Sequence, residues 1–116
     1  NTPLAALTLL NDPTFIEAAR VLAARTLKEG GVDDTQRLRW LWRTTLSRTP
    51  SERELASLAG LLKRNREIYA KDPAAAEKLL KVGLAPVPAD LAPADLAAWT
   101  AVTRALLNLS ETITRN

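Results

Sequence analysis

The sequence contains no cysteine, no histidine and no methionine among its 116 residues. Without cysteine, the chain forms no disulfide bond, no thiolate metal site and no thiol nucleophile. Without histidine, it lacks the usual general base near neutral pH and the commonest metal ligand in proteins. Haem cannot be held here through a His, Met or Cys ligand. These absences exclude several classes of redox, metal and nucleophilic enzyme site from this stretch of chain.

Glycine and aromatic residues are also scarce, at four glycines and 4% of the chain. No apolar run approaches the roughly 20 residues that a membrane span requires, and no signal peptide is recognisable. What the chain has in abundance is alanine and leucine, which favours helices. Its 47% hydrophobic and 25% charged residues are typical of a globular protein. The length therefore predicts one domain over residues 1–116.

Short capping signals mark where helices should begin. Asp12 can cap a helix whose first residue is Pro13, and the same device recurs at residues 72–73. Ser51 and Glu54 have the spacing of a capping box. The predicted helices span about residues 2–10, 13–29, 35–47, 52–71, 73–82 and 93–109. We expect an all-α fold, a compact array of about six short-to-medium helices with no sheet.

Charged residues outside the apolar faces of the predicted helices are expected to face solvent. The second helix places Glu17 and Arg20 on its polar face. The run 63–66 of the longest helix is expected on its solvated outer face, although Asn65 or Arg66 also falls at the position of its apolar stripe. Residues 84–92 contain two prolines and no helical period, which indicates an ordered connector that packs against the domain. Residues 110–116 are expected to form a tail after the last helix.

The acidic residues give no metal site. Asp33 and Asp34 stand side by side, but no further ligands follow at the spacing of a known calcium or zinc motif. Helix capping explains them better. The serines have no histidine partner, and neither a G-x-S-x-G elbow nor a phosphate-binding glycine loop is present. We therefore assign no catalytic, cofactor-binding or metal-binding residue.

The strongest candidate site is a basic and aromatic segment, RLRWLWRTTLSR, over residues 37–48. Arg39 and Arg43 lie one helical turn apart, and Trp40 lies on the neighbouring face. Exposed Arg and Trp side chains are enriched at the energetic centres of protein interfaces. They also suit stacking on nucleotides, although a net charge of +3 is a weak field for a polyanion. A purely structural role, with Trp42 in the core and Trp40 under a loop, is the third interpretation.

Three segments, NTPLAALTLLNDPTFIEAAR, TLSRTPSERELASL and DLAAWTAVTRALLNLSETITR, together resemble a known family. In order and spacing they are similar to the planctomycete-specific C-terminal domain of unknown function of the "PSD-one" type. That domain is found in large envelope proteins that often also carry a cytochrome c domain. The sequence departs from the family pattern at Ala5, Ser110 and Thr112, where the family tends to have Gln, an acid or His, and Phe.

The resemblance implies where the protein is located and what larger protein it belongs to, but it implies no chemical reaction. It implies that the chain is the C-terminal portion of a larger multidomain protein of the extracytoplasmic or periplasmic cell envelope. Any haem would lie in a separate domain of that parent, so no cofactor is expected in this chain. The family supplies no catalytic residue that can be carried over to this sequence.

Our preferred hypothesis is a non-catalytic helical interaction or packing module of a larger envelope protein. Its partner would be the remainder of the parent polypeptide or another protein. Two alternatives stay open, a small basic nucleic-acid-binding helical domain and an accessory part of an enzyme whose catalytic groups lie upstream. The expected contact residues are Leu4, Leu9, Arg39, Trp40 and Arg43.

Overall fold

The computed structural model describes residues 12–115, so the predicted helix at residues 2–10, with Leu4 and Leu9, lies outside the described residues. The described part of the chain is all-α, as predicted, and contains no strand. Its helices are α2 (Pro13–Glu29), α3 (Asp34–Leu46), α4 (Glu52–Lys71), α5 (Pro73–Leu80) and α6 (Pro93–Arg115).

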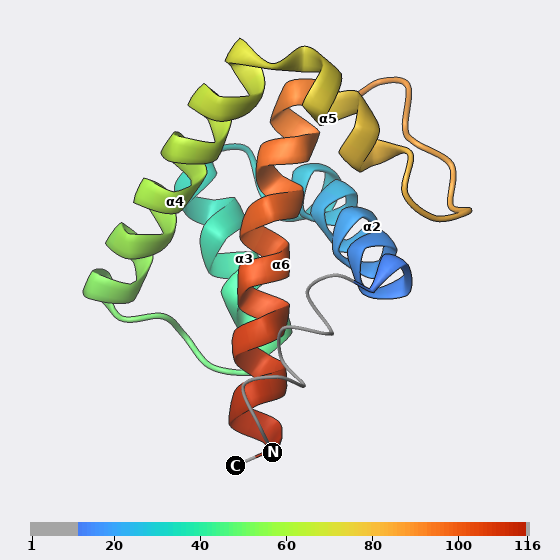
Figure 1. Cartoon of the computed structure of the whole chain (residues 1–116). Helices are drawn as coiled ribbons and strands as arrows, with labels where there is room; N and C mark the ends of the chain where they lie inside the picture. Colours follow the sequence, from blue (N-terminus) through green and yellow to red (C-terminus); the bar gives the residue numbers. More distant parts are fainter. Residues whose placement is uncertain (1–11, 116) are drawn as a thin grey trace.

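Helix α6 is the centre of the arrangement and contacts each of the other four described helices (Figure 1). Its sequence explains this position, because five consecutive residues from Leu96 to Thr100 are all fully buried. A helix that is apolar around most of its circumference must be covered on several sides. The hydroxyls of Thr100 and Thr103 donate hydrogen bonds to main-chain carbonyls one turn earlier, so burial leaves neither hydroxyl unsatisfied.

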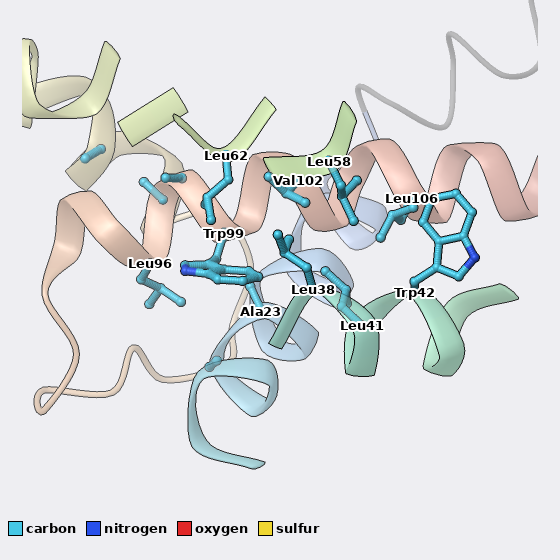
Figure 2. Packing of buried hydrophobic residues seen from close by; sticks show 14 of the residues in the cluster. Ala23, Leu38, Leu41, Trp42, Leu58, Leu62, Leu96, Trp99, Val102 and Leu106 are labelled. Atoms are coloured by element: carbon cyan, nitrogen blue, oxygen red, sulfur yellow. The ribbon is translucent and has the colours of Figure 1, made fainter. Parts of the chain in front are cut away.

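The core forms around Trp99 of α6, whose side chain is fully buried. Figure 2 shows this indole among side chains of three other helices, Ala23, Leu38 and Leu62. A second tryptophan, Trp42, lies beside α6 at the other end of the same cluster. The buried apolar residues of α3 and α4 therefore meet on one central helix.

The predicted helix starts at residues 13 and 52 are confirmed by their capping bonds. The Thr14 N–H donates to the Asp12 carboxylate at 2.7 Å, and Pro13 occupies the first turn. Ser51 and Glu54 form the reciprocal capping box. These contacts satisfy main-chain N–H groups that have no partner within a helix.

The predicted end of the last helix is wrong. Helix α6 continues past residue 109 to Arg115 instead of ending in a tail. No glycine or proline interrupts residues 110–115. The Ser110 hydroxyl donates to the Thr45 carbonyl of α3 at 3.0 Å, which attaches this turn to the bundle.

The placement of Arg20 on a solvated face is also wrong. Its side chain is only 1% exposed, and its guanidinium donates to the carbonyls of Val82, Ala85 and Pro86 at 3.2, 2.7 and 3.3 Å. One turn earlier, the Glu17 carboxylate accepts hydrogen bonds from the N–H groups of residues 84 and 85. Because the connector has no helical bonds of its own, α2 supplies partners for its main chain.

Arg66, which the sequence leaves either at the apolar stripe of α4 or on its solvated face, is half-buried and joins three helices. Its guanidinium contacts Asp34 of α3 at 2.5 and 3.0 Å and Asp95 of α6 at 2.8 Å. It also lies over the Trp99 ring, 6.0 Å from the centroid. The hydrogen bonds from Arg66 lower the pKa of Asp34, despite the opposing effect of its partial burial.

Candidate functional site

The basic and aromatic segment forms helix α3, and the helical repeat separates its two tryptophans. Trp42 points into the core and is 5% exposed, whereas Trp40 is only partly buried at the edge of the core. Arg39 and Arg43 are exposed on the outer side of the helix. A buried tryptophan therefore fixes the helix, and its neighbours present a second indole and two guanidinium groups outward.

Trp40 is held in place by helix α2. The guanidinium of Arg25 lies over its ring, 5.7 Å from the centroid. Arg25 in turn pairs with Glu29 one turn later at 3.3 Å. Cation–π contact of this kind favours one orientation of the indole. Trp40 is therefore a side chain that is already positioned before any partner arrives.

An open groove of about 560 Å³ lies next to Trp40. Its lining residues are Trp40, Arg43, Thr44, Ser47, Arg48 and Thr49. Ser47 ends helix α3 in the left-handed conformation, with φ of 60°. Such a residue ends the helix, as left-handed helix caps do. Residues 48 and 49, which follow the cap, complete the lining of the groove.

The groove lining carries two arginines and no acidic side chain, but the two arginines differ. Arg48 makes a bidentate contact with Glu54 at 2.7 and 2.8 Å and lies 5.1 Å from the centre of the Trp42 ring. This contact lowers the pKa of Glu54 to about 2. Arg43 has no ion pair or side-chain hydrogen bond with the described side chains of residues 12–113. Among these residues, the charge of the groove that is not neutralised is therefore that of Arg43.

The structure brings two of the five predicted contact residues into one groove. Trp40 and Arg43 both line it, whereas Arg39 does not and instead approaches Glu52 of α4 at 3.7 Å. Leu4 and Leu9 lie outside the described residues. Ser47 and Arg48 also line the groove; they belong to the predicted segment 37–48 but are not among the five expected contact residues. A signal for Arg48 is its position six residues before Glu54, the acidic residue of the capping box.

The arrangement is suited to binding by hydrogen bonds, charge and stacking. Across residues 12–115, no group of three or more acidic, His or Cys side chains is placed to hold a metal ion. In the same part of the chain, no helix combines the length and the apolar character that crossing a bilayer demands.

Comparison with known proteins gives one match. Residues 1–62 match the family described as "PSD1: Protein of unknown function (DUF1553)". The matched stretch contains the whole groove beside Trp40 and ends within α4. No curated protein and no solved structure matches the chain.

Proposed function

The chain belongs to the PSD1 family of proteins of unknown function, and from this premise we propose that it is a helical protein-interaction module that binds its partner through the groove beside Trp40. The observation that carries the proposal is the pairing of a fixed indole with an arginine that has no partner within residues 12–115. Trp and Arg are the residues most enriched among interface hot spots.

The groove is built on a rigid support, which reduces the entropy lost on binding. Helix α3 is anchored by the buried side chains of Leu38, Leu41 and Trp42, and Arg25 holds the indole of Trp40. Three hydroxyl groups, on Thr44, Ser47 and Thr49, add donors and acceptors around Arg43. We propose that a carboxylate of the partner pairs with Arg43 while an apolar or planar group packs on Trp40.

The charge distribution favours a protein partner over a nucleic acid. Arg25, Arg39 and Arg48 each have a glutamate within 4 Å, so most of the positive charge around the groove is neutralised. Nucleic-acid binding depends on several phosphate contacts made by uncompensated cations. A single arginine without an ion pair among the described residues is suited to one contact with a carboxylate. Binding to the phosphate backbone of a nucleic acid would require several such cations.

The setting of the module stays a prediction. We propose that its partner is another part of the parent polypeptide or a second protein of the cell envelope, with any haem in a separate domain. These statements depend on the sequence resemblance alone.

The experiment that tests the proposed function is site-specific crosslinking in the native host. A photoreactive residue replaces Thr44 in the groove, or Lys63 on the far side of α4 as the control position. A protein crosslinked from position 44 only would be purified and titrated against the 116-residue chain and its Arg43→Ala variant. We expect the substitution to raise Kd about tenfold. Equal crosslinking from both positions, or binding only to oligonucleotides with steep salt dependence, would contradict the proposal.

A further inference from the structure

A second groove, of about 510 Å³, runs between α4 and α6. Its floor is apolar and contains Trp42, Leu58, Leu61 and Leu106. Figure 2 shows Trp42 and Leu106 side by side at this end of the core. The ion pair of Arg48 and Glu54 separates the two grooves, because Arg48 lines the first groove and Glu54 lines the second.

The apolar surface of this groove continues along α6. Leu109 lines the groove and is 39% exposed, and Ile113, one turn later, is 55% exposed. With Leu106 they follow at spacings of three and four residues, which places all three on one side of the helix. The last turns of α6 thus extend an apolar stripe from the floor of the groove to its open end.

Two arginines mark the edge of the groove on α4. Arg53 and Arg64 are separated by 11 residues, about three helical turns or roughly 16 Å along the axis. Neither makes an ion pair within residues 12–115. The acid in the groove lining, Glu54, is occupied by Arg48 and the Ser51 N–H. The groove edge therefore carries two positive charges that no described side chain of residues 12–113 neutralises.

Two small residues, Ser57 and Gly60, lie between these arginines on α4. Ser57 lines the groove, and Gly60 follows one turn later, next to Arg64 on the helix surface. A Cβ at Gly60 would meet only the Arg64 Nη1 atom, at the ordinary contact distance of 3.6 Å. No described neighbour requires a glycine in this helix interior, where glycine is unfavourable. A small residue there leaves room for another backbone to approach α4 closely.

We propose that the groove between α4 and α6 binds an amphipathic helix of a partner protein, with its apolar stripe on Leu58, Leu61 and Leu109 and with carboxylates about three turns apart that pair with Arg53 and Arg64. Apolar grooves of this kind take helices through side chains at positions i, i+3 or i+4, and i+7. The two arginines set the orientation and the length of the bound helix. The groove does not depend on the function proposed for the surface beside Trp40.

Charge complementarity selects this occupant over a second copy of the chain. The chain carries a net charge of +3, and two of its arginines lie at the groove edge without an ion pair among the described side chains. Bringing two such edges together places like charges opposite each other, whereas an acidic helix neutralises them. A partner helix with acidic ends is therefore the better match.

The test uses a fluorescently labelled 16-residue peptide with leucines along one face and glutamates at positions 2 and 13. Binding to the 116-residue chain is followed by fluorescence anisotropy. The matched control peptide has lysine in place of both glutamates, and a second control has the same composition with the leucines scattered around the helix. We expect the glutamate peptide to bind at least about tenfold more tightly than either control.

Two variants locate the binding site. Ser57→Trp should fill the groove and abolish binding, and Arg53→Glu combined with Arg64→Glu should reverse the preference toward the lysine peptide. These side chains are exposed, so circular dichroism should show unchanged helicity. Lys63→Glu, outside the groove lining, is the control and should leave Kd unchanged. Equal affinity for the glutamate and lysine peptides would overturn the proposal. So would binding that survives Ser57→Trp, or a dimer of the chain that Ser57→Trp dissociates.

Discussion

Arg66 of α4 and Asp34 of α3 are joined by two hydrogen bonds between guanidinium and carboxylate, at 2.5 and 3.0 Å. The same guanidinium reaches Asp95 of α6, so one side chain connects three helices. Its charge lies over Trp99, the largest fully buried side chain among the described residues. Arg66 therefore connects the ion pairs at the surface of the bundle with the tryptophan at the centre of its core.

Replacing Arg66 should loosen this junction without unfolding the domain. The ion pairs are partly exposed, so we expect Arg66→Ala to lower the free energy of unfolding by about 1 kcal/mol. Arg64→Ala is the matched control, because Arg64 is exposed and makes no ion pair within residues 12–115; its effect should stay within about 0.5 kcal/mol. Urea denaturation of both variants measures the difference, and equal effects would show that the junction contributes nothing.

Glu54 should contribute an acid-sensitive part of the stability. Hydrogen bonds from Arg48 and the Ser51 N–H lower its pKa from 4.5 to about 2 in the folded state. Its stabilisation is therefore complete above about pH 4.5 and is lost as the pH falls through about 2. We expect Glu54→Gln to flatten the dependence of the unfolding free energy on pH in this window. The exposed neighbour Glu52→Gln is the control, and identical pH profiles for the two variants would contradict the assignment.

The buried guanidinium of Arg20 should be needed to hold the connector. Arg20→Met keeps the length of the side chain but leaves the carbonyls of Val82, just before the connector, and of Ala85 and Pro86 within it without their donor. We expect a loss of about 2–3 kcal/mol, because hydrogen bonds from charged groups are among the stronger ones. The connector around residues 82–88 should also become sensitive to protease. Lys28→Met on the same helix, whose contact with Asp90 is exposed at 3.7 Å, should change neither property.

Gly60 should lower the stability of α4 while it leaves the groove between α4 and α6 accessible to a partner helix. Gly60→Ala removes an unfavourable residue from a helix interior and meets no close neighbour, so we expect the unfolding free energy to rise by about 1 kcal/mol. The added methyl group should at the same time weaken binding of the glutamate peptide. Thermal unfolding and anisotropy on the same preparation test both effects. A variant that is more stable and binds equally well would show that the glycine has no role in docking.

The helix starts could be predicted from the sequence because capping is a local interaction. Asp12 and Ser51 bond to main-chain groups two or three residues away, and the spacing alone reveals them. Trp40 and Arg43 are close for the same reason, because side chains three residues apart are neighbours on the surface of a helix. The part of the candidate site within one helix was therefore predictable.

The partners of Arg20 and Arg66 could not be predicted in this way. Arg20 contacts residues more than 60 positions away, and Arg66 contacts Asp34 and Asp95 across 32 and 29 positions. A helical pattern assigns charged residues to the solvent face by default, because burial without a partner is costly. Which charges find buried partners depends on how the helices pack. The position of Arg48 in the groove likewise depends on the turn at Ser47. The left-handed conformation of Ser47 could not be predicted, because glycine is the residue that usually marks such a cap.

The position of α6 has a consequence for the order of synthesis. A ribosome makes the chain from its N-terminal side, so helices α2 to α5 emerge before the helix that each of them contacts. Until residues 93–106 have been made, the side chains that surround Trp99 lack their common partner. The described helices therefore complete their native packing only after α6 has been made.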